Sequence, residues 1–113
     1  MPSILYFNPQ CSKCRATKEL LDERSAEIDV IEYLKTPPNA AEIRSILEML
    51  GISAHQLVRD GDAKKLGLDY KSLNESELIG EMTKNPIIIQ RPILISNGEA
   101  RIGRPPETVL EII

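Results

Sequence analysis

The chain has 113 residues, of which 42% are hydrophobic and 27% are charged, enough for one domain with a single core. No apolar run is long enough to cross a membrane, and no basic segment followed by an apolar stretch marks the N-terminus for secretion. The formal net charge of −3 gives no support for nucleic-acid binding. We therefore expect a cytoplasmic protein. The small size and the lack of a coiled-coil pattern favour a monomer.

The first third of the chain predicts a strand, a helix and a second strand. Residues 4–7 are apolar and β-prone, and Asn8-Pro9 ends that strand. From residue 13 onward, apolar residues recur at helical spacing between charged ones, which indicates an amphipathic helix. Residues 28–33 predict a strand parallel to the first, because the crossover between them contains a helix. The apolar positions expected to face inward from the helix are Ala16, Leu20 and Leu21.

The middle of the chain, residues 39–85, predicts several helices and no strand. Asn39 and Asn74 each stand three residues before a glutamate, the spacing of a capping box. Ser53 is suited to cap a shorter helix, and residues 62–66 predict one further turn. These signals divide the segment into short helices.

The last third predicts two strands and a helix. Asn97-Gly98 is a strong hairpin turn between strands at residues 92–95 and 100–102. A final helix is expected to bury the stripe Pro106, Val109, Leu110 and Ile113. The whole order predicts an α/β fold in one domain, 1–113. It is a thioredoxin-like β-α-β / β-β-α core with a helical insertion, at about residues 39–85, between the second and third strands.

Two cysteines lie where the first strand gives way to the helix. A helix N-terminus carries free N–H groups and a partial positive charge, so the pKa of Cys11 should be lowered. Lys13 and Arg15 add positive charge, and Cys14 is close enough to attack an adduct on Cys11. The alternatives are two inert core thiols or a zinc site. Because zinc usually needs four ligands and the chain has two Cys and one His, we expect no metal.

Three arginines are candidates for binding an anion. Arg91 precedes Pro92 at the head of a predicted strand, Arg104 follows the return strand, and Arg59 ends a short helix of the insertion. In a thioredoxin-like fold the strand after the X-Pro bond starts beside the cysteine loop, which favours Arg91 and Arg104 as neighbours of Cys11. Guanidinium groups converging on a helix N-terminus would bind a tetrahedral oxyanion. The alternative is that these arginines are solvated surface charges.

The chain carries a set of motifs that are weak singly and specific together. They are Asn8-Pro9-x-Cys11 with Arg15, Leu57-Val58-Arg59, Asn85-Pro86 followed by Arg91-Pro92-Ile93, and Gly103-Arg104-Pro105. Over essentially its whole length the chain resembles the ArsC family of arsenate reductases, the type that uses glutathione and glutaredoxin.

This resemblance implies a role for each motif residue. Cys11 would be the nucleophile that attacks arsenic, and Arg59, Arg91 and Arg104 would hold the oxyanion. The Arg91–Pro92 bond would be cis. Residues implied to support the site are Asn8, Ser12, Lys13, Arg15 and Pro92. The family binds no cofactor: glutathione is a co-substrate that attacks the Cys11–arsenate adduct, arsenite leaves, and glutaredoxin restores the thiol.

The sequence departs from the family pattern at two positions. Phe7 stands where family enzymes often carry histidine, and Cys14 stands where many carry serine. A thiol at position 14 offers an intramolecular disulfide with Cys11, and regeneration by a dithiol reductant such as thioredoxin.

Two other functions stay open at this point. Spx regulators, which bind RNA polymerase, resemble this chain in fold and use a C-x-x-C pair as a redox switch. The other alternative is a glutathione-dependent oxidoreductase with a different substrate. His55, the single histidine, is expected to be a structural or surface residue, and the apolar runs at 87–89 and 93–95 are expected to be core.

Overall fold

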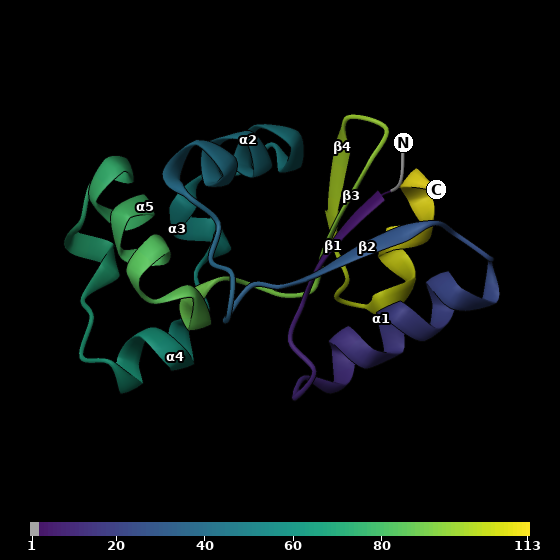
Figure 1. Cartoon of the computed structure of the whole chain (residues 1–113). Coiled ribbons are helices and arrows are strands. Elements are labelled where there is room, and N and C mark those ends of the chain that lie inside the picture. The colour runs from purple at the N-terminus through teal and green to yellow at the C-terminus, as the bar shows by residue number, and fades with distance from the viewer. Residues whose placement is uncertain (1–2) are drawn as a thin grey trace. The chain divides into compact units, whose positions relative to one another are not determined.

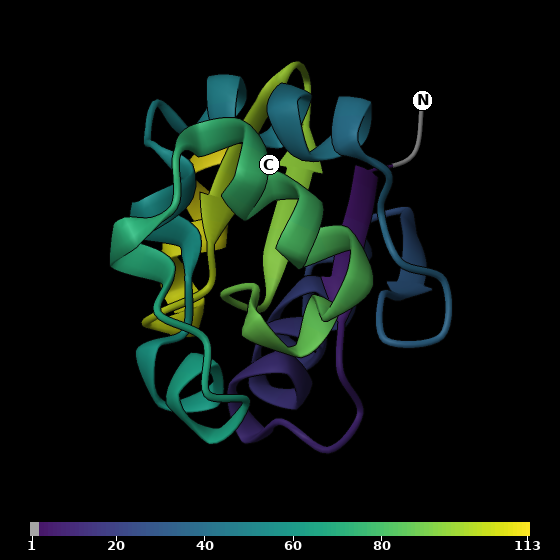
Figure 2. The same ribbon diagram turned by 90° about the vertical axis from the view of Figure 1, so that its left-hand side faces the viewer.

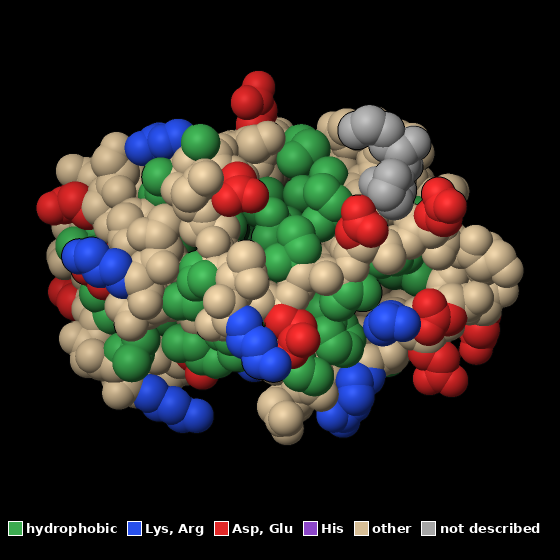
Figure 3. Space-filling view, viewed as in Figure 1, with side chains coloured by type: hydrophobic (Ala, Val, Ile, Leu, Met, Phe, Trp, Pro, Cys, Tyr) green, Lys and Arg blue, Asp and Glu red, His purple; other side chains and the backbone are tan. Residues whose placement is uncertain are grey.

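The computed structural model describes residues 3–113, which divide into two compact units. The sheet unit comprises residues 3–36 together with Arg91–Ile113, and the helical unit comprises Pro37–Gln90. None of the helices in the described part of the chain is long and apolar enough to span a membrane. On the face shown in Figure 3, basic side chains lie among acidic ones, without a broad basic patch.

The sheet unit contains four strands in the order β2-β1-β3-β4. Strands β1 and β2 are parallel, whereas β3 is antiparallel to both β1 and β4. The β-α-β order followed by β-β and a helix is the predicted thioredoxin-like arrangement (Figure 1). Its elements are β1 (Ser3–Phe7), α1 (Ser12–Glu23), β2 (Ile28–Glu32), β3 (Ile93–Ser96), β4 (Glu99–Ile102) and the 3-10 helix η3 (Pro106–Ile112).

The hydrophobic core of this unit lies on one face of the sheet. Leu5 of β1 and Leu94 of β3 pack there against Leu21 of α1. Val109 and Ile112 of η3 complete the buried cluster. In Figure 1 the yellow C-terminal helix lies beside α1, so both cover the same side of the strands.

The hairpin between β3 and β4 forms at the predicted turn. Asn97 and Gly98 have positive φ angles of 54° and 76°. Two successive residues in this region match the right-handed twist of the flanking strands, which is why Asn-Gly is favoured there. The hairpin sets the register of β4 and therefore the position of the chain that follows it.

The inward face of α1 differs from the predicted stripe. The helix begins at Ser12 and buries Cys14, Thr17 and Leu21, whereas Ala16 and Leu20 are only half-buried. Starting the helix just after Cys11 turns the small polar side chain of Thr17 inward, and hydrophobicity alone did not identify that position.

The predicted stripe of the last helix was wrong at its end. The segment is a 3-10 helix with about three residues per turn, so side chains three positions apart line up. Pro106, Val109 and Ile112 are therefore buried, whereas Ile113 is 44% exposed. The α-helical spacing used for the prediction does not hold here.

The helical unit, drawn in teal and green in Figure 2, contains only helices as regular elements. The predicted capping boxes at Asn39 and Asn74 are present. Ser53 is the N-cap residue of α3, as predicted. The turn expected over residues 62–66 starts earlier, at Asp60, because Arg59 serves as its N-cap. The elements of the helical unit are α2 (Ala40–Leu50), α3 (Ala54–Leu57), α4 (Asp60–Lys65), η1 (Tyr70–Ser72), α5 (Glu75–Lys84) and η2 (Pro86–Ile88).

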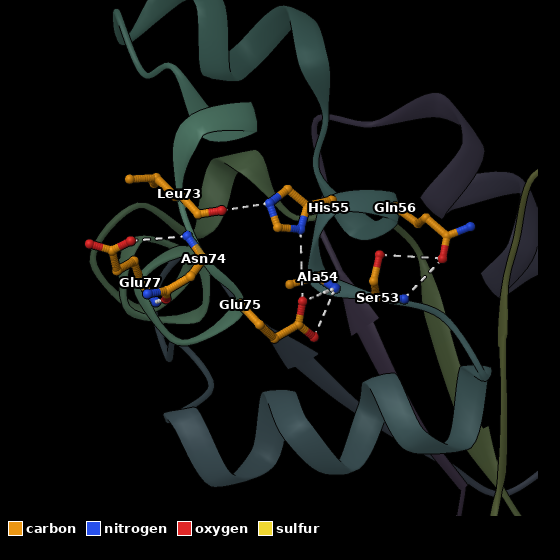
Figure 4. Close-up of polar contacts among 8 residues, drawn as sticks. All are labelled: Ser53, Ala54, His55, Gln56, Leu73, Asn74, Glu75 and Glu77. Atoms are coloured by element: carbon orange, nitrogen blue, oxygen red, sulfur yellow. Dashed lines mark hydrogen bonds and ion pairs between the residues drawn. The ribbon is translucent and has the colours of Figure 1, made fainter.

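His55 connects α3 to the start of α5 (Figure 4). Its Nε2 lies 2.8 Å from the Leu73 carbonyl oxygen, which can only accept a hydrogen bond, so Nε2 carries the proton. Its Nδ1 lies 3.8 Å from the Glu75 carboxylate, and that carboxylate also accepts the Ala54 backbone N–H at 3.1 Å. These contacts agree with the structural role expected for this histidine.

The register of the 3-10 helix can be tested with two neighbouring isoleucines. Ile112→Ala should lower the free energy of unfolding by about 2 kcal/mol, because it removes buried methyl groups. Ile113→Ala should change it by less than about 0.5 kcal/mol, because that side chain is exposed. Urea denaturation measures both. Equal losses, or a larger loss at Ile113, would contradict the 3-10 register.

Candidate active site

Cys11 is the N-cap residue of α1, at the junction that the sequence predicted. Its backbone is extended, with φ −95° and ψ 123°, and its N–H donates to the Asn8 carbonyl oxygen at 3.0 Å. The buried Asn8 side chain accepts the Gln10 backbone N–H, also at 3.0 Å. Asn8 therefore holds the loop twice, once through its backbone and once through its amide oxygen.

The other residues of the first turn act on the loop in different ways. The Arg15 guanidinium donates to the Pro9 carbonyl oxygen at 3.0 Å, so it braces the loop from the helix side. The side chains of Ser12 and Lys13 are exposed. Phe7, at the end of β1, packs against the hydrophobic core.

The surroundings of Cys11 favour its thiolate. Burial of the sulfur opposes the charged form, but the backbone N–H and the thiol of Cys14 counter that effect. The Arg91 guanidinium and the Lys13 backbone N–H add to the stabilisation. Together they lower the pKa of Cys11 to about 7, so about half of the protein carries a thiolate near neutral pH.

Cys14 differs from Cys11 although the two thiols are adjacent. Its side chain is fully buried, and burial raises the pKa of Cys14 to about 11. The Asn8 backbone lowers it, whereas the neighbouring Cys11 sulfur raises it further. Cys14 is therefore a protonated thiol that stabilises the Cys11 thiolate, and both cysteines are free.

Two of the three predicted arginines lie at Cys11. Arg104 Nη2 lies 3.6 Å from Cys11 Sγ, and its Nε donates to the Arg91 carbonyl oxygen at 2.7 Å. The Arg91 side chain also interacts with Cys11. The thiolate thus faces two guanidinium groups carried on different segments of the sheet unit.

Gly103 fixes the segment that carries Arg104. Its N–H donates to the Pro92 carbonyl oxygen at 2.9 Å, and the Arg91–Pro92 bond is cis, as the family resemblance implied. A Cβ at Gly103 would lie 2.7 Å from Thr17 Oγ1 and 2.8 Å from Pro92 Cγ. Because only glycine fits there without moving these neighbours, the chain passes tightly between α1 and the start of β3.

Arg59, the third predicted arginine, belongs to the helical unit. Its Nε donates to Asp62 Oδ2 at 2.7 Å, and its backbone N–H donates to the Ile88 carbonyl oxygen. The guanidinium is thus already paired within its own unit. Its role as an oxyanion ligand stays a prediction.

Tyr33 is a neighbour of the site that the sequence analysis did not single out. It directly follows β2, is 2% exposed, and lies near the Arg91 guanidinium, whose pKa it helps to raise. The signal was present in the sequence, because parallel strands end at the same edge of a sheet and Tyr33 follows one such end. It was assigned to the strand instead.

The assembled group can act as a nucleophile toward a centre that carries negative oxygen atoms. The Cys11 thiolate supplies the electron pair, and Arg91 and Arg104 supply charge-assisted hydrogen bonds. Within residues 3–113, no three His, Cys, Asp or Glu side chains lie close enough together to hold a metal ion.

Comparison with known proteins places the chain in a family. The model of the ArsC family matches residues 6–112, and the chain belongs to that family. The uncharacterized protein YfgD of Escherichia coli is 49% identical over 112 residues, covering 96% of this chain and 94% of that protein. An arsenate reductase of Neisseria meningitidis serogroup B is 38% identical over 117 residues, and the match covers both chains fully.

A solved structure extends the likeness to three dimensions. The arsenate reductase from Vibrio cholerae has a TM-score of 0.88 and 37% sequence identity, with 100% of this chain and 98% of that chain covered. The thioredoxin-like α/β fold is therefore shared with proteins of this family.

The reactivity of the two thiols can be measured directly. The alkylation rate of Cys11 with iodoacetamide should rise with pH, with a midpoint near 7, because only the thiolate reacts. Cys11→Ser protein, which keeps the buried Cys14, should be labelled much more slowly. A midpoint close to the ordinary thiol value of about 8.5, or fast labelling of the Cys11→Ser variant, would contradict this picture.

Proposed function

We propose that this protein is an oxidoreductase that reduces arsenate to arsenite, with Cys11 as the nucleophile. The observation that carries the proposal is the Cys11 sulfur, at the N-terminus of α1, facing the guanidinium groups of Arg91 and Arg104. A thiol that only exchanges disulfides does not need two guanidinium groups beside it. A thiolate that attacks a tetrahedral oxyanion does need them, because they offset the negative charge of the oxyanion. The full-length similarity to arsenate reductases supports arsenate as that anion.

In the first step the Cys11 thiolate attacks arsenic(V) and a sulfur–arsenic bond forms. One arsenate hydroxyl leaves as water after taking up a proton, so the oxidation state of arsenic does not change. Arg91 and Arg104 hold the remaining oxygens and offset their charge, and Arg59 is proposed as a third ligand. The helix N-terminus is suited to the same negative charge.

In the second step glutathione reduces the adduct. Its thiolate attacks the Cys11 sulfur, the sulfur–arsenic bond breaks, and its electron pair stays on arsenic, which leaves as arsenite. Two thiols are oxidised to one mixed disulfide, which balances the two electrons that arsenic gains. A glutaredoxin then exchanges with the mixed disulfide and restores the Cys11 thiol.

Cys14 offers an internal route for the same reduction. Its pKa is raised by the neighbouring Cys11 sulfur, so Cys14 is near enough to attack that sulfur without being exposed, once a base has taken its proton. Arsenite would leave with the electron pair, and a Cys11–Cys14 disulfide would remain for a dithiol reductant such as thioredoxin. The pKa of about 11 opposes this route, because little thiolate is present at neutral pH, and we therefore favour glutathione.

Steady-state arsenate reduction, coupled to NADPH oxidation, tests the nucleophile and the reductant together. We expect turnover with glutathione, glutaredoxin and glutathione reductase, none with Cys11→Ser, and retained turnover with Cys14→Ser, because serine can still donate to the Cys11 thiolate. Parallel assays with thioredoxin and its reductase measure the internal route. Turnover by Cys11→Ser would refute the proposed nucleophile, and activity with thioredoxin alone would refute the preference for glutathione.

A second experiment tests the anion site. Arg104→Ala should lower kcat/KM for arsenate by about tenfold to a hundredfold, because a charge-assisted contact to the oxyanion is lost. Arg101→Ala is the matched control, since Arg101 on β4 pairs with Glu111 and has no place in the proposed site. Equal kinetics for the two variants would remove Arg104 from the site.

A further inference from the structure

We propose that Thr17 is a positioning residue of the Cys11 site, whose side chain packs against Gly103 and thereby sets how closely the Arg104 segment approaches the nucleophile. The consequence of this contact for catalysis rests on the proposed function. Its consequence for the Cys11 thiol does not depend on arsenate.

The Arg104 guanidinium is linked to the nucleophile by a long contact. Its Nη2 lies 3.6 Å from Cys11 Sγ, and its Nε donates to the Arg91 carbonyl oxygen at 2.7 Å. Hydrogen bonds weaken as their atoms separate, so a small shift of the Arg104 backbone would weaken the contact with the sulfur. The position of that backbone therefore matters for the thiolate as well as for a bound oxyanion.

The backbone before Arg104 forms a tight turn centred on Gly103. The Arg104 N–H donates to the Ile102 carbonyl oxygen at 2.9 Å, a bond that spans three residues. The Gly103 N–H donates to the Pro92 carbonyl oxygen, also at 2.9 Å. These two bonds fix the direction in which the chain leaves β4, so the place of Gly103 determines the place of Arg104.

The side chain of Thr17 limits how closely Gly103 approaches α1. A Cβ added at Gly103 would lie 2.7 Å from Thr17 Oγ1. Because a Cα–Cβ bond is about 1.5 Å long, Thr17 Oγ1 lies within about 4.2 Å of the Gly103 Cα, which is contact distance. Thr17 is fully buried, so its side chain is enclosed at this contact. The pair is therefore a packed contact between α1 and the Arg104 segment.

Thr17 and Cys11 belong to the same helix. Cys11 is the N-cap residue of α1, and Cys14, Thr17 and Leu21 form the buried face of that helix. An α-helix rises by a fixed amount per residue, so Thr17 lies about 9 Å along the axis from the nucleophile. A contact at Thr17 therefore places the Arg104 segment relative to the helix that bears the sulfur.

The hydroxyl of Thr17 is not explained by hydrogen bonding. Within residues 3–113 its Oγ1 has no hydrogen-bond partner, although the atom is buried. Burying a hydroxyl without a partner costs stability, so a valine of the same shape would be the more stable choice here. A β-branched side chain has few χ1 rotamers and presents a fixed surface to its neighbours. We therefore assign the role of Thr17 to its contact with Gly103.

Two variants separate this contact from the chemistry of the hydroxyl. Thr17→Ala empties the space beside Gly103, so the Arg104 segment is free to shift. The alkylation midpoint of Cys11 should then move upward from about 7, because the guanidinium stabilises the thiolate less. We expect kcat/KM for arsenate to fall by about tenfold, since a misplacement of about 1 Å can cost about a hundredfold. Thr17→Val keeps the branched shape and should change neither quantity.

The matched control is Leu21→Ala, on the same buried face one turn further along α1. Leu21 belongs to the core cluster, so this variant should lose stability in urea denaturation. It should leave the alkylation midpoint of Cys11 unchanged, because it does not touch the Arg104 segment. A midpoint shift in Thr17→Ala without one in Leu21→Ala separates positioning from a general loss of packing.

The same contact can be tested from its other side. Gly103→Ala adds a Cβ that meets Thr17, so it should raise the midpoint and lower kcat/KM. With Thr17→Ala the added Cβ has more room, so the double variant should be less impaired than Gly103→Ala alone. Recovery should be partial, because the Pro92 ring lies 2.8 Å from the same Cβ. Urea denaturation of each variant shows whether the fold is retained.

The outcomes that would overturn the proposal are distinct. One is an unchanged midpoint and kcat/KM in Thr17→Ala, and another is an equal loss in Thr17→Val, since the hydroxyl would then matter and not the contact. A third is an equal effect of Thr17→Ala with and without Arg104→Ala, which would show that Thr17 does not act through Arg104. If the protein does not turn over arsenate, the proposed function fails, and the alkylation midpoints still decide the role of Thr17.

Discussion

The site depends on one junction, where the end of β1 is joined to the start of α1 by the short loop that carries Cys11. Burial of a sulfur favours the neutral thiol, whereas the free N–H groups of a helix N-terminus favour the thiolate. At Cys11 the second effect prevails, because the neighbouring thiol and the Arg91 guanidinium add to the backbone N–H groups. At Cys14, one turn into the same helix, burial prevails. Near neutral pH, Cys11 is thus largely able to ionise whereas Cys14 stays protonated, because the two thiols lie one helical turn apart and differ in burial.

The arginines reach this junction from two segments that adjoin strands of the sheet. Arg91 lies two residues before β3, and Arg104 lies in the connection between β4 and η3. The Arg104 guanidinium contacts both the Cys11 sulfur and the Arg91 backbone, so the two cationic segments are also linked to each other. Each arginine is therefore placed by the strand that it adjoins, and its long side chain spans the remaining distance to the sulfur.

The local signals of the chain were sufficient to predict its strands and α-helices, but not the short 3-10 helices η1 and η2, and they were less successful in predicting which side of each helix is buried. Cap residues such as Asn39 and Asn74 act within one turn, so their effect is visible in the sequence. The burial of Ile112 rather than Ile113 depends on a 3-10 geometry that apolar spacing does not reveal.

Some residues of the candidate site could likewise be predicted from local sequence signals, and others could not. Cys11 was predictable because strand, loop and helix are consecutive in the chain. Arg91 and Arg104 were recognised as neighbours of Cys11 through the fold and the family motifs. Tyr33 was not recognised as a neighbour of the site. Its position near Arg91 depends on how β2 pairs with β1, and a buried aromatic residue at a strand end is equally typical of a hydrophobic core.

Gly103 lies where two parts of the site meet. It passes between Thr17 of α1 and the ring of Pro92 with no room for a side chain, and its N–H donates a hydrogen bond to the Pro92 carbonyl oxygen. A side chain at position 103 would therefore have to displace Thr17 or Pro92. The first lies on the helix that begins beside the sulfur, and the second follows Arg91, so the absence of a Cβ at one position protects two parts of the site.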